Sequence, residues 1–589
     1  MVHWARRAMS VVSTLTLASF VVACSSPAPA PAKPAPATAV PPPTTTAPAA
    51  ATAAPAAKTD AAAPASAQPV KPKVDRLIMA VQAPGRESND LRHHGMPDVW
   101  ELRPMYEYLI GVDPQTGKLI PQLATEWEIN PSGPSVRFKL RRGVQFHDGA
   151  GEFTAQDVVF SREQLILPDS LHGQKAYYEE VTKQIEIVND YEVIFHLSRP
   201  DANFIRAHSE NEGGFEIRSK ASFDKNGPPT MQTRPIAGTG PYQYKDRQQG
   251  QFIRFERVPW QHWRVTPDFP EFEFRFSKEP STRMAGLLAG EVHVTSLPED
   301  LLKQAEGRGQ KIITATVPGV RNVLHTYGGI VKDWKDPSQG TLDSPLADVR
   351  VRKALDKAIN RDELNKAFLG GKGESYAPVH YHPKLPGWRP DWQTRFADEY
   401  GYDPAAARGI LAEAGYGPAN PLKTNIILTA VGGLEGYEGD VLESIGEFWR
   451  KVGVDVTLDS SDANSIDGQA RARAYNNHFR MRNTSSSLYL ALWVFYTVSY
   501  QGTVQALYPF NPEIDRLFGQ LRASLDEQQQ QRIYQEIGEI MFTHHTNIPL
   551  FWTTAQGIVN PNIVASYTLP GSISGTWTHV EYIKAVPAS

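Results

Sequence analysis

The stretch that decides the class of fold is V-R-F-K-L-R-R-G-V-Q-F-H-D-G-A-G-E-F-T-A-Q-D-V-V-F-S, residues 136–161. Every second residue from 136 to 140 is apolar and the residues between them are charged, which is the period-2 pattern of a half-buried strand. Thr154 then precedes a helical pattern with Asp157 three residues further on, a variant of the capping box. A strand followed so closely by a capped helix predicts a mixed α/β body.

Strand and helix signals of the same kind continue beyond this stretch. Residues 184–197 predict a hairpin that turns at Asn189-Asp190, and a second hairpin is expected around Gly250. The second half of the chain is richer in helices with clear ends. We expect helices that open at Ser344-Pro345, Asn360, Asp403-Pro404 and Asp526, and then a strand over residues 548–552.

The length and composition describe an ordinary folded protein without a strong overall charge. The chain has 589 residues, more than a single hydrophobic core usually supports, so several lobes are expected. Its residues are 41% hydrophobic and 21% charged, and the formal net charge is -4. This balance gives no electrostatic reason to expect nucleic acid or an anionic membrane surface as a partner.

The N-terminal residues are typical of an export signal. Arg6 and Arg7 precede an apolar stretch over residues 8–23, which is shorter than the roughly 20 strongly apolar residues that cross a bilayer core. The stretch ends in Val21-Val22-Ala23-Cys24, which resembles the bacterial lipobox, where the cysteine is lipidated. Cys24 is the only cysteine, so we interpret it as an acylation site and expect no disulfide within the chain.

The residues after Cys24 predict a tether. Residues 25–73 are almost entirely Ala, Pro, Thr and Ser, which cannot bury enough apolar surface to offset the loss of chain entropy. The many prolines favour extended conformations. We therefore expect a signal peptide over residues 1–24, a disordered tether over residues 25–73, and a folded body from residue 74 onward.

Several separated motifs of the body resemble one known family, the extracellular solute-binding proteins of the oligopeptide, dipeptide and nickel class that serve ABC importers. The resemblance runs from about residue 77 to residue 570. The stretch 138–161 is its most diagnostic part. The other motifs are MYEYL at 105–109, PQLATEW at 121–127, GTGPY at 238–242, WQHW at 260–263, PLADVRVRKAL at 345–355 and YDPAAAR at 402–408.

The resemblance implies an α/β, two-lobed fold like that of periplasmic binding proteins, also called a Venus flytrap, with an extra inserted domain and discontinuous lobes. It implies a lobe I built from residues 74–115, 240–328 and 556–589. An accessory domain II is expected over residues 116–239 and a lobe III over residues 329–555. The solute is then engulfed between lobes that close by hinge bending, because it binds the closed form more tightly.

The function that follows from the resemblance is capture and delivery. We expect an extracytoplasmic lipoprotein that binds a small-to-medium organic solute and passes it to permease subunits, while separate ATPase subunits supply the energy. The chain is expected to be a monomer and not an enzyme, with no catalytic residue, no cofactor and no protein-bound metal. Adjacent histidines such as His93-His94 and His380-Tyr381-His382 have no carboxylate or cysteine partner in the sequence and are weak evidence for a metal.

We infer the expected charge of the solute from the lack of acidic residues in one segment of the chain. Peptide-binding members of the family pair the free amine of the peptide with a carboxylate late in the large lobe. The corresponding residues here, 468–512, contain no Asp or Glu but four arginines and several aromatic residues. A buried amine without a counter-charge is costly, so a neutral or anionic solute is expected unless another lobe supplies the acid.

The candidate ligand-binding residues lie where the lobes of the family cross and in this aromatic segment. They are Arg321, His325, Tyr327, Arg482, Asn483, Tyr489, Trp493, Tyr496 and Tyr500. Leu488, Leu490 and Leu492 alternate with other residues, which predicts a strand there. The alternative is that the aromatic residues are ordinary core and that the arginines lie on a solvated face.

Two other classes of function stay open. The first is a secreted hydrolase or peptidase that acts on a similar solute, and the second is a ligand receptor without a role in transport. The sequence has no Gly-x-Ser-x-Gly elbow and no His-Glu-x-x-His helix, the patterns on which a hydrolase interpretation would rest. A hydrolase would need a nucleophile or paired carboxylates that converge in the binding site.

Overall fold

The computed structural model describes most of the folded body. The described residues are 69–94, 99–130, 133–212, 214–316, 319–431, 437–461, 465–466, 469, 472–484, 487–498, 509–569 and 577–588. The expected signal peptide, Cys24 and residues 25–68 of the expected tether lie outside these ranges. Within the described residues, no helix combines the length and the apolarity needed to cross a membrane.

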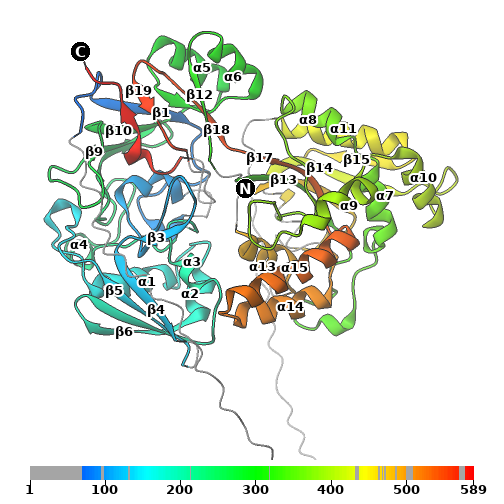
Figure 1. The fold of residues 1–589 in the computed structure, drawn as a ribbon, viewed down its shortest axis with the longest axis horizontal. Coiled ribbons are helices and arrows are strands. Elements are labelled where there is room, and N and C mark those ends of the chain that lie inside the picture. Colours follow the sequence, from blue (N-terminus) through cyan, green and yellow to red (C-terminus); the bar gives the residue numbers. More distant parts are fainter. Residues whose placement is uncertain are drawn as a thin grey trace, which may run out of the picture. The chain divides into compact units, whose positions relative to one another are not determined.

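The first sheet has seven strands that come from three separate stretches of the chain (Figure 1). Its spatial order is β12 (Lys311–Thr314), β18 (Gln556–Val559), β11 (Val294–Thr295), β1 (Arg76–Val81), β10 (Glu271–Phe276), β9 (Phe252–Arg257) and β8 (Tyr242–Gln248). The hairpin predicted around Gly250 is confirmed by the antiparallel pairing of β8 with β9. Helices α5 (Pro280–Ala289) and α6 (Glu299–Glu306) contact β11 and β12, respectively.

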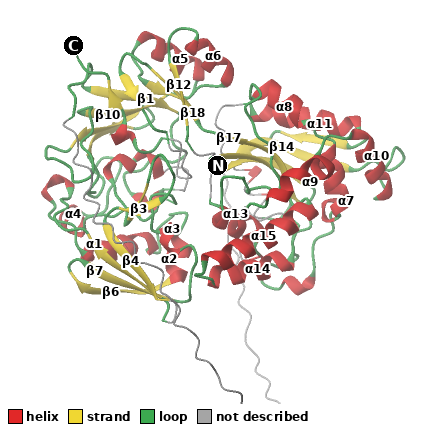
Figure 2. Cartoon of the chain, viewed as in Figure 1, coloured by secondary structure: helices red, strands yellow, loops and turns green. Residues whose placement is uncertain are grey.

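The second sheet contains residues 136–140, the predicted strand at the start of the stretch 136–161. Its order is β4 (Ala124–Asn130), β5 (Ser135–Leu140), β7 (Glu192–Leu197) and β6 (Thr182–Asn189). Helices α1 (Ala155–Ile166) and α2 (Lys175–Val181) contact β6. Figure 2 shows both helices in red near the yellow strands of this sheet. The expected capping box is confirmed, since the Thr154 amide donates to the Asp157 carboxylate at 2.9 Å. The hairpin expected over residues 184–197 is the β6–β7 pair.

The third sheet has five strands and carries the candidate site. Its order is β15 (Asp455–Asp459), β14 (Lys423–Val431), β16 (His478–Thr484), β13 (Val320–Tyr327) and β17 (Ile548–Thr553). Two short ladders complete the pairing: β2 (Ile110–Val112) with β3 (Leu119–Pro121), and β19 (Val564–Ser566) with β20 (Lys584–Ala585). All eight residues of β13 are buried, so this strand runs through the interior of the body.

The described helices of the second half are α7 (Val349–Lys357), α8 (Arg361–Phe368), α9 (Pro390–Tyr400), α10 (Pro404–Glu413), α11 (Glu438–Lys451), α13 (Leu488–Tyr496), α14 (Pro512–Ala523) and α15 (Glu527–His544). Most of them begin at a short polar side chain that caps them, whereas α9 and α11 begin without a side-chain cap. Asn360, Asp403 and Asp526 cap α8, α10 and α15, as expected. The helix expected to open at Ser344 is instead divided, because Asp348 caps α7 after a separate turn over Pro345–Ala347.

The prediction of a strand over residues 488–492 is wrong, because these residues open helix α13. The Ser487 hydroxyl accepts a hydrogen bond from the Leu490 amide at 3.2 Å and so caps the helix. The segment L-Y-L-A-L-W-V-F-Y is apolar throughout, and a short buried run of this kind does not distinguish a strand from a helix by its periodicity. The alternating leucines therefore carried no information about the backbone.

The GTGPY motif at residues 238–242 has a clear packing reason for one of its glycines. The Gly240 amide donates to the carbonyl of Met105 at 3.0 Å, so two backbone segments lie in direct contact. A Cβ atom at Gly240 would lie 2.7 Å from the Met105 carbonyl carbon and 2.7 Å from the Pro104 carbonyl oxygen. The neighbours are backbone atoms, so they cannot move aside by changing a rotamer.

We expect Gly240→Ala to lower the free energy of unfolding by about 1 to 3 kcal/mol, the usual cost of overpacking. Gly409→Ala is the matched control, because Gly409 lies exposed in α10 with nothing within 4 Å of an added Cβ. That change should raise the free energy of unfolding by up to about 1 kcal/mol, since alanine favours helix interiors. Urea unfolding measures both variants, and equal stability of the two would refute the packing argument.

Candidate ligand-binding site

The register of two paired strands places the first candidate residues on one face of the five-stranded sheet. β13 pairs with β16 so that Val323 faces Arg482, His325 faces Arg480 and Tyr327 faces His478. Directly opposed residues of an antiparallel pair project from the same face, and every second residue does so along each strand. Arg321, His325, Tyr327, Arg480 and Arg482 therefore gather on one face.

The centre of the opposite face is apolar, and Asn322 and Thr326 flank it along β13. Leu324 of β13 faces Met481 of β16, and both belong to a hydrophobic cluster with α7 and α11. This alternation fixes which side the polar residues take, because a shift of one residue would bury arginines among the leucines. The burial of the apolar residues therefore determines on which side of the sheet the polar residues lie.

Phe495 of α13 covers the polar face. Its ring meets the ring of His325 at an interplanar angle of 68°, with 4.7 Å between their centroids. The guanidinium carbon of Arg482 lies 5.7 Å from the same ring centroid. The Arg482 guanidinium also donates from Nε and Nη2 to the Tyr327 hydroxyl at 3.3 Å. One aromatic ring thus contacts both a histidine and an arginine of the paired strands.

His380 completes this group, although the sequence analysis did not include it among the ligand-binding residues. Its ring stacks on Phe495 with an interplanar angle of 9° and a centroid distance of 5.8 Å. The centroids of His380 and His325 are 6.3 Å apart. The backbone of His380 has φ of 71°, a region that side-chain-bearing residues seldom adopt and that costs about 1 kcal/mol or more. The sequence signal was the His380-Tyr381-His382 run, which was considered only for metal.

The two imidazoles are buried without hydrogen bonds. His325 and His380 are 0% and 1% exposed, and none of their four ring nitrogens has a hydrogen-bond partner among the described residues. A buried polar group without a partner costs about 1 to 3 kcal/mol, so such groups are rare in native proteins. Burial, together with the positive charges of Arg482, Arg480 and Arg321, holds the pKa of His325 well below its usual value. Burial, Arg321 and His325 do the same to the pKa of His380.

Arg321 lies at the other end of the group. Its guanidinium carbon lies 5.2 Å from the ring centroid of Trp552 in β17. Burial lowers the pKa of Arg321 to about 9, opposed by the nearby Tyr496 and Glu212. A guanidinium in this environment remains charged at neutral pH, and it adds to the positive potential at the two histidines.

Tyr496 is held by polar neighbours of its own. Its hydroxyl accepts a hydrogen bond from the Asn547 side-chain amide at 2.6 Å. Its ring meets the ring of His380 edge-on at 5.7 Å. Tyr496 therefore borders the group of histidines. The side chain of Asn483 and the whole of Tyr500 lie outside the described residues.

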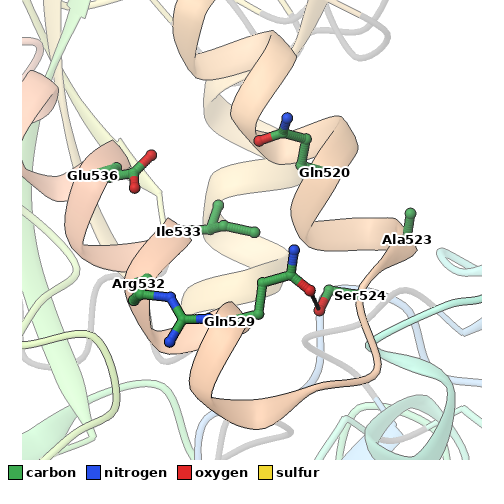
Figure 3. A pocket seen from close by; sticks show the side chains of 7 residues that line it. All are labelled: Gln520, Ala523, Ser524, Gln529, Arg532, Ile533 and Glu536. Carbon is green, nitrogen blue, oxygen red and sulfur yellow. Dashed lines mark hydrogen bonds between the residues drawn. The ribbon is translucent and has the colours of Figure 1, made fainter. Parts of the chain in front are cut away.

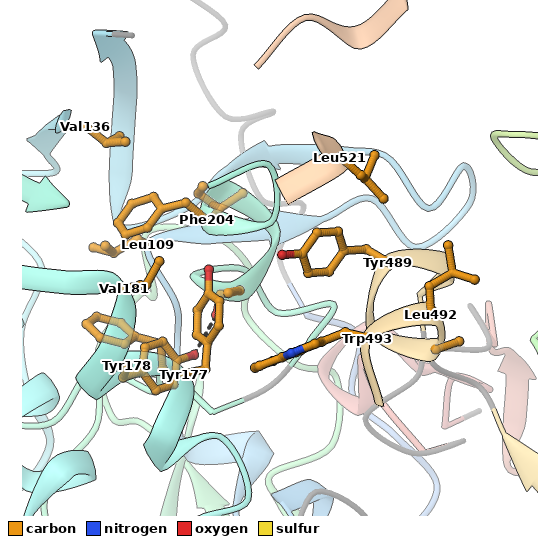
Figure 4. Packing of buried hydrophobic residues seen from close by; sticks show 14 of the residues in the cluster. Leu109, Val136, Tyr177, Tyr178, Val181, Phe204, Tyr489, Leu492, Trp493 and Leu521 are labelled. Carbon is orange, nitrogen blue, oxygen red and sulfur yellow. Dashed lines mark hydrogen bonds between the residues drawn. The ribbon is translucent and has the colours of Figure 1, made fainter. Parts of the chain in front are cut away.

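Tyr489 and Trp493 lie on another side of α13, where they pack against residues of the four-stranded-sheet segment. Figure 4 shows Tyr177 of α2 beside both side chains. The Tyr177 and Trp493 rings are 5.8 Å apart, and the Arg522 guanidinium carbon lies 5.8 Å from the Trp493 ring centroid. Tyr489 meets Phe518 of α14 at 5.1 Å. Both residues belong to a hydrophobic cluster that α1, α2, α14 and α15 share.

A buried acid near the group was missed by the sequence analysis. Glu212 is 1% exposed, and burial raises its pKa despite the opposing effects of Arg206, Ser487 and Arg321. Its carboxylate oxygens form no hydrogen bond of normal geometry, although the Ser487 hydroxyl lies close enough to lower the pKa. Residues 468–512 lack acids, but another segment thus supplies one close to Arg321. No local sequence signal distinguishes Glu212 from the neighbouring Glu210 and Glu216.

A separate pocket lies between α14 and α15 (Figure 3). It has a volume of about 410 Å³ and is lined by Gln520, Ala523, Ser524, Gln529, Arg532, Ile533 and Glu536. The Ser524 hydroxyl donates to the Gln529 side chain across it at 2.8 Å. It contains none of the candidate ligand-binding residues. Across the described ranges, no group of three or more His, Cys, Asp or Glu side chains could hold a metal ion.

Comparison with known proteins gives the family to which this chain belongs. Residues 118–505 match the family model of the bacterial extracellular solute-binding proteins, family 5. This match covers more than half of the chain, so the chain belongs to that family. The dipeptide-binding protein of Escherichia coli (strain K12) is 29% identical over 377 residues, which cover 60% of this chain and 66% of that protein, just under two thirds of its length.

Solved structures with the same fold carry different ligands. DppA from Helicobacter pylori in complex with the peptide STSA has a TM-score of 0.68 at 20% identity and covers 87% of this chain and 98% of that chain. NikA from Brucella suis in complex with Fe(III)-EDTA has a TM-score of 0.69 at 20% identity and covers 87% of this chain and 100% of that chain. The expected α/β fold of the periplasmic-binding-protein type is thereby confirmed.

We expect His325→Leu to raise the free energy of unfolding of the solute-free protein by about 1 kcal/mol, because it removes two buried nitrogens that have no partner. His545→Leu is the matched control, since His545 is equally buried but its Nδ1 lies 3.2 Å from Asp356 Oδ2. That change should lower the free energy of unfolding by about 1 to 3 kcal/mol, because it leaves the buried Asp356 carboxylate without this partner. Urea unfolding at pH 7 tests both variants, and a destabilised His325→Leu protein would contradict the assignment.

The same variant should also change the response of stability to pH. The pKa of His325 is depressed in the folded state, so below its unfolded value near 6.5 the unfolded chain binds one more proton. Stability is then lost as the pH falls, by at most about 1.4 kcal/mol per unit for each such group. Between pH 7 and pH 5, His325→Leu should lose about 2 kcal/mol less than the wild type. Equal losses in the two proteins would show that His325 is not held neutral.

Proposed function

We propose that this protein captures a small-to-medium organic solute outside the cytoplasm and delivers it to the permease subunits of an ABC importer, whose separate ATPase subunits supply the energy. The protein itself performs no chemistry on the solute and acts as a monomer. The observation that carries the proposal is the buried group of His325, His380 and Arg482, whose hydrogen-bonding capacity the described residues leave partly unused. Membership of a solute-binding family supports it.

The contacts across α13 suggest how the solute enters. Phe495 of α13 covers the polar group, while Trp493 of the same helix contacts Tyr177 in the four-stranded-sheet segment. That segment is joined to α14 by an ion pair between Glu180 and Arg522 at 2.9 Å, and by a hydrogen bond from the Ala202 amide to the Arg522 carbonyl at 3.1 Å. The ion pair between Glu180 and Arg522 is partly exposed and therefore contributes little to stability, whereas the contact between Tyr177 and Trp493 is buried. We propose that the solute enters when these contacts separate and that it favours their closure.

The ligands of related proteins do not fix the solute. The related proteins include a dipeptide-binding protein and proteins whose structures hold a peptide or Fe(III)-EDTA. One fold therefore serves several ligand chemistries, and the side chains of the site decide between them. For this chain the proposed ligand-binding residues are Arg321, His325, Tyr327, Arg482, Tyr489, Trp493 and Tyr496, together with His380.

Capture is tested by the small molecules that the protein retains. The full chain is incubated with a low-molecular-mass extract of bacterial cells, washed and denatured, and the released compounds are identified by mass spectrometry. We expect at least one compound at near-equimolar level, recovered unchanged. Arg482→Gln should retain at least tenfold less of it. Arg516→Gln should retain as much as the wild type, because Arg516 is exposed and pairs only with the nearby Glu513 on α14. Conversion of the compound would instead favour a hydrolase, and no retention at all would refute capture.

The proposed lipid anchor has its own test. Cys24→Ala should move the protein from the membrane fraction to the soluble fraction, because the thiol that would carry the lipid is lost at the only cysteine. Cell fractionation followed by immunoblotting measures the distribution. The Ser25→Ala variant is the control and should remain with the membrane. A Cys24→Ala protein that stays in the membrane fraction would exclude this anchor.

A further inference from the structure

We infer that the captured solute carries an oxyanion, and that this group binds between the Arg482 guanidinium and the imidazoles of His325 and His380. The inference rests on the proposed function and goes beyond it, because it names the chemistry that the site selects. It also assigns His380 a role in binding that neither the sequence motifs nor the family match indicates.

Arg482 calls for a hydrogen-bond acceptor. A guanidinium has five N–H donors and no acceptor, and here two of its nitrogens share one neutral partner, the Tyr327 hydroxyl. The side chain is 6% exposed, and no carboxylate among the described residues forms an ion pair with it. A buried cation without an anion is costly, and a planar two-oxygen anion matches the guanidinium fork.

The two histidines lie beside this cation at fixed positions. His325 and Arg482 are diagonal neighbours across the β13–β16 pair, and both contact the ring of Phe495. The stacked and edge-on contacts with Phe495 hold both imidazole planes. A neutral imidazole carries one N–H donor, so each histidine can donate once to an oxygen placed between them and Arg482. The group therefore offers donors from three side chains that all contact the ring of Phe495.

The positive charge of the site favours an oxyanion over a neutral carbonyl or an ammonium group. The positive charges of Arg482, Arg480 and Arg321 all act on His325, and each of them makes protonation of that ring less favourable. The same potential repels an ammonium group and attracts an anion, and it acts strongly because the surroundings are buried. An oxyanion at this point would relieve the charge of Arg482 and use the free imidazole donors at once.

The buried carboxylate of Glu212 could favour an amine-bearing solute, but it lies in a different place from the histidines. Its carboxylate lies near Ser487, the residue that caps α13, whereas Phe495 lies eight residues further along that helix. A free amine of the solute bound at Glu212 would lie near Arg321, whereas Arg482 and both imidazoles contact the ring of Phe495. An amine of the solute is therefore not required for the oxyanion to bind.

The test offers the full-length protein four portions of one low-molecular-mass extract of bacterial cells. The first portion is untreated, in the second the carboxyl groups are amidated, in the third phosphate groups are removed by phosphatase, and in the fourth the amines are acetylated. Retained compounds are measured by mass spectrometry for the wild type, His380→Leu, Glu212→Gln and Arg516→Gln. Thermal unfolding of each variant first establishes that it is folded.

We expect the untreated and acetylated portions to yield retained compound, and either the amidated or the phosphatase-treated portion to lose it at least tenfold. The portion that loses it identifies the oxyanion as a carboxylate or a phosphate. A folded His380→Leu protein should retain at least tenfold less, while Glu212→Gln and Arg516→Gln retain the wild-type amount.

Retention from all four portions would overturn the oxyanion and leave solute capture intact. Loss only after acetylation would overturn it in favour of an amine-bearing solute. Absence of any retained compound, even from the untreated portion, would refute the proposed function itself. A folded His380→Leu protein with wild-type retention would remove that histidine from the site.

Discussion

The arrangement of this protein depends on the pairing of β13 with β16. The register that buries Leu324 and Met481 beneath α7 and α11 is the same register that brings Arg321, His325, Arg480 and Arg482 to the other face. A slip of one residue would exchange the two sets and bury charge in the apolar core. The hydrophobic core on one side of the sheet thus fixes the position of the polar site on the other side. All eight residues of β13 are buried, and the strand register determines on which face each of their side chains lies.

Helix α13 connects this site with the rest of the body. It presents Phe495 to the histidines, and it presents Trp493 to Tyr177 of the four-stranded-sheet segment. Ser487, which caps the helix, lies near the buried Glu212. One short apolar helix therefore contacts the polar face, the neighbouring segment and a buried acid. The helix is thus one physical connection between the polar face and the side chains of Tyr177 and Arg522.

The parts of the fold that follow local chemistry could be predicted from the sequence. Caps at Thr154, Asn360 and Asp403 and the hairpin at residues 184–197 were predictable, because a side chain and backbone only a few residues away form each interaction. Helix α13 was not, since an apolar run fits either backbone once tertiary contacts bury it. His380 lies 55 positions after His325 in the chain, and only the folded structure brings their rings within 6.3 Å. Which arginines are buried likewise depended on sheet pairing that no local pattern reveals.

If the solute binds on the polar face of β13 and β16 beneath Phe495, a crystal structure of the protein with its retained compound will show it there. We expect electron density for the compound in contact with Arg482, His325 and His380, with its anionic group nearest to the guanidinium. Density in the pocket between α14 and α15, with the histidines still lacking hydrogen-bond partners, would contradict it.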